Sequence, residues 1–215
     1  MHPTIARMKL DMKSMANDVW ILVEEWQHHV HRGKVMLQHI ESVYSRIFSG
    51  ENQLDDIQRP RELRTMERRI RLLYQRLDVP LKMMQNTLKL LTDIRDKATE
   101  IQRRMTLWML DDHFEDYTIR RSLTTQKLLE MLNFLRKRYD AEWEVKEMVV
   151  LNLPQITTSY DLEILREAWG QSVHIGGELF ERKILEYYHA IGRRTMSTMF
   201  TNPPMPFAYG SRRIN

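Results

Sequence analysis

Two long stretches of this sequence place apolar residues at alternating spacings of three and four, and this rhythm constrains the fold more than any other feature. A repeat that averages 3.5 residues is the a/d pattern of helices that pack as a left-handed coiled coil. We therefore expect one helix over about 4–48 and a second over about 62–108. The first stripe consists of Ile5, Met8, Met12, Met15, Val19, Leu22, Trp26, His29, Gly33, Met36, Ile40, Val43 and Ile47. The second consists of Leu63, Met66, Ile70, Leu73, Leu77, Pro80, Met84, Thr87, Leu91, Ile94, Ala98, Ile101, Met105 and Trp108.

These two helices predict an elongated molecule. A helix over 4–48 is about 68 Å long at a rise of 1.5 Å per residue, whereas a compact domain of this size has a radius of gyration of about 17 Å. The polar segment 49–61 joins the helices, with Gly50 as the residue that ends the first one. The expected arrangement is an antiparallel helical hairpin over 1–108, with a kink or break near Val79 because Pro80 cannot donate a helical hydrogen bond. Residues spaced by seven widen the first stripe, so this helix is expected to contact more than one neighbour: Ala16, Val23, Val30, Leu37 and Tyr44.

The rest of the chain predicts a helical region over 115–194 and an irregular tail over 195–215. An acidic loop over 109–116 ends the hairpin, and a third long helix follows over about 117–151. Two short helices come next, over about 158–169 and 178–191. Thr158 and Asp161 predict a capping box at the first of them, and Gly192 ends the second.

Composition agrees with an all-α fold. The chain of 215 residues contains only seven glycines and seven prolines, which argues against an all-β fold or a glycine-looped nucleotide-binding fold. Cysteine is absent, which excludes disulfides, thiolate catalysis and cysteine-ligated metals.

Charge gives a weaker indication about partners. The net charge is +4, and the arginines of segment 59–76 are expected to spread around their helix as a solvated surface. The alternative is an acidic partner or a phosphate backbone, although no interleaved aromatic residues indicate base stacking, and specific nucleic-acid contact is not expected. No apolar run is long enough for a signal peptide or a membrane span, which predicts an intracellular protein without membrane contact.

Histidine is the only residue type that suggests a catalytic or metal site. The pairs Glu25–His28 and Glu186–His189 have the Glu-x-x-His spacing found in di-iron helical bundles. A chain with this many glutamates and eight histidines contains such pairs by chance, and Glu25 and His28 flank the apolar stripe. No phosphate-binding loop or nucleophile elbow is present. We therefore expect no catalytic residue, no cofactor and no metal.

Large aromatic and aliphatic side chains near the stripes are the candidates for core or partner contacts. Trp20 lies six residues before Trp26, so one of the two, Trp20, is expected off the main stripe, against another helix or a partner. The candidate partner-contact residues are Trp20, Trp26, Leu37, Tyr44, Trp143 and Trp169.

Several short motifs resemble those of a known helical family. Residues 127–131 (KLLEM) resemble the opening of one helix, and residues 156–160 (ITTSY) the segment before the next helix, in the cyclin-dependent kinase 2-interacting protein family. Trp169 precedes a Gly-basic ending, here residues 192–194, as in the family. Residues 18–26 are similar to a family stretch with two tryptophans, although Val19 stands at the first tryptophan position. Residues 91–105 are similar only as a leucine- and isoleucine-rich coil, and the stretch from Tyr160 to Trp169 is about one turn longer.

The resemblance implies a small, non-catalytic helical adaptor of the nucleus, with a cytoplasmic pool allowed. Its implied partners are another small helical subunit and an AAA+ ATPase assembly, in DNA replication, checkpoint signalling and ribosome biogenesis, and a cyclin-dependent kinase is a further candidate. The same hairpin would also serve as a structural coiled-coil subunit of a spindle, kinetochore or tethering complex, and this alternative stays open.

Overall fold

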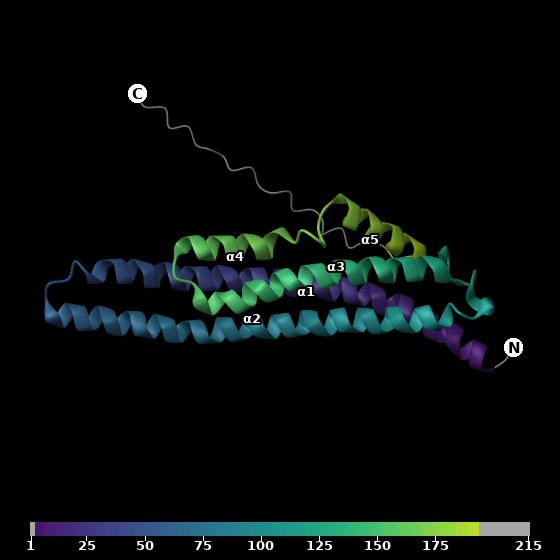
Figure 1. Cartoon of the computed structure of the whole chain (residues 1–215), viewed down its shortest axis with the longest axis horizontal. Coiled ribbons are helices and arrows are strands. Elements are labelled where there is room, and N and C mark those ends of the chain that lie inside the picture. Colours follow the sequence, from purple (N-terminus) through teal and green to yellow (C-terminus); the bar gives the residue numbers. More distant parts are fainter. Residues whose placement is uncertain (1–2, 194–215) are drawn as a thin grey trace, which may run out of the picture.

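The computed structural model describes residues 3–193 and confirms the all-α fold. Helices α1 (Pro3–Leu54) and α2 (Pro60–Trp108) run antiparallel along the whole length of an elongated molecule (Figure 1). Helix α3 (Thr125–Asn152) lies along this hairpin, and the short helices α4 (Ser159–Gln171) and α5 (Glu178–Ile191) cover it. The hairpin with three further helices is the predicted architecture.

The predicted stripes form the α1–α2 interface. The buried residues of α2 follow the expected rhythm from Ile70 to Met105, and Pro80 and Thr87 are buried among them. On α1 most of the expected stripe is buried as well, from Met12 to Ile47. The second line on α1 is also used, since Ala16, Val23, Leu37 and Tyr44 are buried and α1 contacts α3, α4 and α5 in addition to α2.

The turn of the hairpin differs from the prediction. Helix α1 continues six residues past Phe48 to Leu54, so Gly50 lies inside the helix instead of ending it. A Cβ atom on Gly50 would lie 3.1 Å from Cγ1 of Ile70, which is tighter than ordinary contact. The glycine therefore allows the two helices to approach closely, and the connecting segment shortens to residues 55–59.

Both prolines of α2 are accommodated within the helix. Pro60 occupies the first turn, where a missing N–H costs nothing because that group has no helical partner. Pro80 lies in the buried stripe, and α2 continues past it as one element, so the predicted break near Val79 is absent. The predicted kink stays a prediction.

The third helix begins later than expected. Residues 117–124 were expected in this helix, but they contain the strands β1 (Thr118–Arg120) and β2 (Leu123–Thr124), which pair antiparallel. Ile119 and Leu123 are buried, while Arg121 turns the chain with a positive φ of 48°. The strands are too short to leave a period-two pattern in the sequence. The 3₁₀ turn η1 (Asp112–Phe114) precedes this pair of strands.

The ends of α3, α4 and α5 follow their capping residues. The Thr124 hydroxyl accepts a hydrogen bond from the Lys127 backbone N–H and starts α3. The 3₁₀ turn η2 (Leu153–Gln155) follows α3, and the predicted capping box of Thr158 and Asp161 starts α4. Gly192, with φ of 72°, ends α5 as expected. The tail over 195–215 lies outside the described residues.

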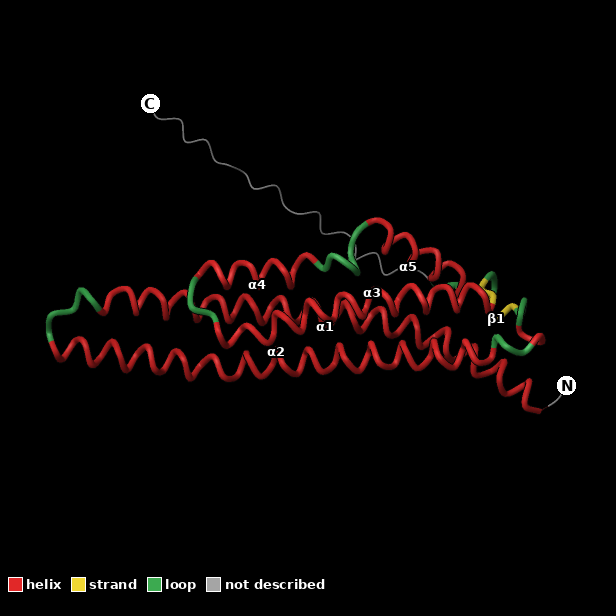
Figure 2. The backbone as a smooth tube through the Cα atoms, viewed as in Figure 1, coloured by secondary structure: helices red, strands yellow, loops and turns green. Residues whose placement is uncertain are grey.

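The hairpin is longer than the helices that cover it. Near its turn, α1 and α2 extend past the η2 connection between α3 and α4, and of the helices that the structure describes these two alone continue to the turn (Figure 2). We call residues 45–54 and 60–76 the hairpin arm. Ile47, Ile70 and Leu73 are buried in it. None of the described helices is long and apolar enough to cross a membrane.

Candidate functional site

The centre of the molecule brings Trp26 of α1 against Tyr139 of α3. Their rings stack with centroids 4.2 Å apart and planes within 3° of parallel. Both side chains are buried, and neither the Trp26 Nε1 atom nor the Tyr139 hydroxyl has a hydrogen-bond partner among the described residues. Burial raises the pKa of Tyr139, so the phenol stays neutral. The stack is therefore a packing contact between α1 and α3.

Trp169 of α4 is the second buried anchor, and it depends on Gly33 of α1. The indole is fully buried, and its Nε1 donates a hydrogen bond to the Val30 carbonyl at 3.0 Å. A Cβ atom on Gly33 would overlap the indole ring. Gly33 interrupts the apolar stripe of α1 because the ring needs that space.

We expect Gly33→Ala to destabilise the protein by about 1–3 kcal/mol, because the added methyl group forces a rigid, buried ring to move. Alanine by itself favours a helix over glycine by about 0.5–1 kcal/mol, so the two effects have opposite signs. Gly170→Ala is the matched control, since no atom lies within 4 Å of the added Cβ there. Chemical denaturation of both variants checks the prediction, and an equal gain in both would contradict it.

A buried ion pair joins α3 to α4 and to the loop after α4. Glu142 and Lys146 of α3 are both fully buried, with Oε1 and Nζ 2.5 Å apart. Lys146 Nζ also donates to the Trp169 carbonyl at 2.6 Å, and Glu142 Oε2 accepts from the His174 backbone N–H at 2.9 Å. Burial lowers the pKa of Lys146, an effect that Glu142 partly offsets. The pair thus satisfies backbone groups at the end of α4.

The remaining candidate partner residues also have contacts within the chain. Leu37 is buried, and the Tyr44 hydroxyl donates to the Leu153 carbonyl at 3.0 Å. Trp143 is half-buried, and its Nε1 donates to Thr92 Oγ1 at 2.8 Å. Four of the candidates are buried inside the chain, so they serve as the core contacts that the sequence also allowed: Trp26, Leu37, Tyr44 and Trp169. Partner contact by the half-buried Trp143 stays a prediction.

Trp20 lies off the main stripe, as predicted, and is half-buried, as Trp108 and Trp143 are. The Arg193 guanidinium lies 4.1 Å from the centroid of its ring, which is cation–π geometry. Partner contact by Trp20 stays a prediction.

The two Glu-x-x-His pairs lie apart. Glu25 and His28 are exposed on α1, whereas Glu186 and His189 are exposed on α5. Within residues 3–193 no group of three or more His, Asp or Glu side chains could hold a metal ion. Burial, followed by the neighbouring charge of His28, lowers the pKa of His29, which favours its neutral form.

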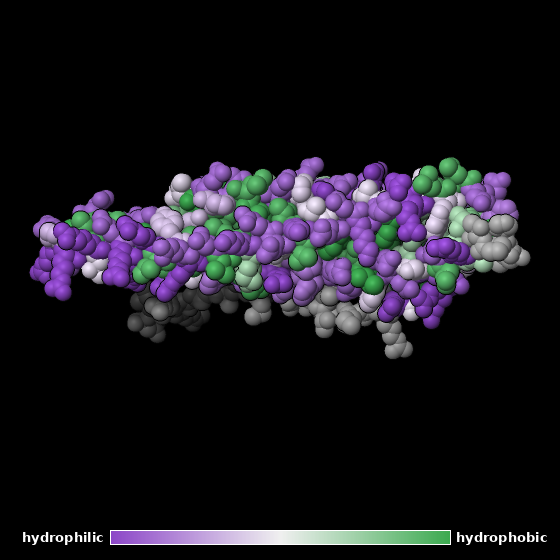
Figure 3. Space-filling view, turned by 90° about the horizontal axis from the view of Figure 1, so that it is seen from below, coloured by the Kyte–Doolittle hydropathy of each residue, from purple (hydrophilic) through white to green (hydrophobic). Residues whose placement is uncertain are grey.

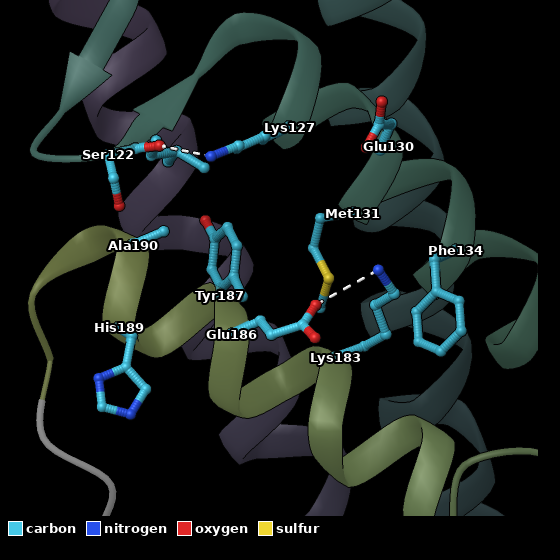
Figure 4. Close-up of a pocket in the computed structure, with 11 residues that line it drawn as sticks. Ser122, Lys127, Glu130, Met131, Phe134, Lys183, Glu186, Tyr187, His189 and Ala190 are labelled. Carbon is cyan, nitrogen blue, oxygen red and sulfur yellow. Dashed lines mark hydrogen bonds and ion pairs between the residues drawn. The ribbon is translucent and has the colours of Figure 1, made fainter.

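A groove between α3 and α5, with a volume of about 540 Å³, is a hollow that could accept a ligand (Figure 4). We call it the α3–α5 groove. Its less polar lining consists of Leu123, Met131, Phe134, Tyr187 and Ala190. Its polar rim consists of Ser122, Lys127, Glu130, Lys183, Glu186 and His189.

Two pairs of residues on this rim interact with each other. Lys127 Nζ donates to the Ser122 carbonyl at 3.3 Å, and Lys183 Nζ lies 3.3 Å from Glu186 Oε2 (Figure 4). The Met131 side chain points into the groove beside the Tyr187 ring (Figure 4). The Tyr187 hydroxyl donates to the Ala16 carbonyl at 2.6 Å, so it also ties α5 to α1. An apolar floor with a rim of both charges suits a side chain of a bound peptide.

No motif in the sequence indicated the groove. Its walls come from a strand that was expected to be helical and from the outer sides of two helices. Comparison with models of known protein families and with curated protein sequences gives no match to this chain.

Proposed function

We propose that this protein is a non-catalytic helical adaptor of a nuclear multiprotein complex. The observation that carries the proposal is the hairpin arm, where two long helices extend beyond the helices that cover the rest of the hairpin. Helices with a continuous apolar interface form a stiff rod, and the uncovered sides of a rod are a typical docking surface for other helices. The arm and the body would thus hold two partners at a fixed separation.

The motif resemblance supports the identity of the complex. It favours a second small helical subunit and an AAA+ ATPase as partners, with roles in DNA replication, genome maintenance and ribosome biogenesis. A cyclin-dependent kinase is a further candidate partner. The proposal assigns no catalytic residue, cofactor or metal to this chain.

The test is affinity purification of the tagged full-length chain from nuclear extract, with the co-purifying proteins quantified by mass spectrometry. A hexameric AAA+ ATPase and a small helical subunit should dominate. Enrichment of microtubule or centromere proteins would instead support a structural coiled-coil subunit. A compact monomer with no recoverable partner would refute the adaptor function.

Trp20→Ala provides a separate prediction for the same function. Because Trp20 is half-buried and stacks with Arg193, its loss should weaken partner binding more than it lowers the melting temperature. Trp143→Ala is the control, since that indole is hydrogen-bonded to Thr92 between α2 and α3 and should lower stability first. Yield of co-purified partners and thermal unfolding are measured for both. Full partner yield with a large loss of stability in Trp20→Ala would reverse the assignment.

A further inference from the structure

We propose that the outer face of α2 over residues 61–82, along the arm and just beyond it, binds an acidic amphipathic helix of a partner protein. We call this surface the basic face, and it consists of Arg61, Arg64, Arg68, Leu72, Arg76, Val79 and Lys82. The inference rests on the proposed adaptor function, because it specifies where and by what chemistry one partner would bind.

The geometry of α2 gathers these residues on one side. At 100° per residue they fall within a sector of about 120°, and they extend over about 32 Å of helix. The buried residues Ile70, Leu73 and Leu77 lie on the opposite side, against α1. The expectation that the arginines of this segment spread around the helix is therefore only partly right. Arg69 and Arg71 lie on the flanks, whereas the other four arginines of this segment within α2 fall on the basic face.

The cations of the basic face are accessible to a partner. All five are exposed, and among the described residues none of them takes part in an ion pair. The nearby carboxylates Glu62, Glu67 and Asp78 fall outside the 120° sector, and Glu62 already pairs with Arg59. Viewed from the side of α2, hydrophilic side chains gather over the arm, with smaller hydrophobic areas between them (Figure 3).

Two aliphatic residues lie in the middle of this charge. Leu72 and Val79 are 50% and 65% exposed and are seven residues apart. They belong to a second row with spacings of three and four, which is offset by two residues from the buried stripe. This row consists of Thr65, Arg68, Leu72, Gln75, Val79 and Lys82.

An apolar pair at heptad spacing with flanking arginines is the pattern that a helix recognises in a coiled-coil partner. Leu72 and Val79 would contact apolar residues of the partner helix, while Arg64 and Arg76 would pair with its glutamates or aspartates. Arginine suits this role because its guanidinium group can bind a carboxylate through two hydrogen bonds. A nucleic acid would use the cations but would leave both aliphatic side chains uncovered, and the face carries no aromatic residue for base stacking.

Binding can be measured directly with a synthetic probe. We would use a fluorescent helical peptide of about four heptads with leucine at positions a and d and glutamate at e and g. Its matched control has lysine in place of glutamate, and a DNA duplex of about 20 base pairs serves as the second probe. Fluorescence anisotropy with the full-length chain is recorded at several salt concentrations, because binding between exposed charges weakens as salt rises.

Two variants of the basic face separate its charged and apolar contributions. Arg64→Glu/Arg68→Glu/Arg76→Glu should weaken binding of the acidic peptide by at least about tenfold at low salt. Leu72→Ser/Val79→Ser should weaken it several-fold with an unchanged salt dependence. The matched control is Lys13→Glu/Lys137→Glu/Arg182→Glu, which changes net charge equally at exposed positions away from the face and should bind almost as the parent does. Circular dichroism confirms that each variant remains folded.

Three results would overturn the proposal. The first is an equal loss of peptide binding in the basic-face and control triple variants, and the second is equal binding of the acidic and the lysine peptide. The third is unchanged peptide binding by Leu72→Ser/Val79→Ser, together with tight DNA binding that the basic-face triple variant abolishes. If the basic-face variants still co-purify every partner of the parent chain, the adaptor function stands and this surface assignment falls.

Discussion

Trp169→Ala should lower the free energy of unfolding by about 3–5 kcal/mol, the cost of removing a large aromatic side chain from a packed site. In the parent chain the indole is fully buried in the space that Gly33 leaves on α1. In the variant the Val30 carbonyl also loses the hydrogen bond that the indole N–H donates. For a chain of this size the melting temperature should fall by about 10 °C. The loss should be greatest where α4 and α5 cover α1, so amide exchange there should rise most.

Trp169→Phe separates packing from hydrogen bonding. Phenylalanine retains most of the buried ring but cannot donate to the Val30 carbonyl, so its cost should be smaller. Thermal and chemical unfolding of both variants provide the measurement. Unchanged unfolding of Trp169→Ala would show that this residue does not anchor α4 on α1.

Lys146→Met should cost a similar amount, about 3–5 kcal/mol, because it leaves the Glu142 carboxylate buried without a countercharge. The Trp169 carbonyl also loses the Nζ donor at 2.6 Å. The double variant Glu142→Leu/Lys146→Met should recover part of that loss, since it removes the buried charge. The Trp169 carbonyl and the His174 N–H would still lack their partners. A double variant that is less stable than Lys146→Met would contradict this interpretation.

The sequence alone determined which segments form the helices. The 3.5-residue rhythm identified α1 and α2 because residues at that spacing share one side of a helix wherever it packs. Local chemistry also set the ends of α4 and α5, where Thr158 and Asp161 cap one helix and Gly192 ends the other. These signals act within a few residues, so they can be identified without knowledge of the fold.

Contacts between distant residues were not predictable in this way. Gly50 looked like a helix end, but it is a glycine inside α1 because Ile70 packs closely against it. Gly33 likewise leaves space for the Trp169 ring. Glu142 and Lys146 have the i,i+4 spacing of an ordinary surface pair. Only the positions of α4 and the following loop bury them. The residues offered as partner contacts were mostly core residues for the same reason, because a stripe does not specify which helix covers it.

The sequence by itself therefore determined that the chain forms long amphipathic helices with two apolar rows, since that information lies in local spacing. The tertiary structure decided which rows are used inside the molecule and which remain outside. Helix α3 packs mainly on α2, and α4 packs on α1, whereas nothing in the described chain covers the outer face of α2 along the arm. Burial depends on what packs against a surface, and that is settled only when residues far apart in the chain come together.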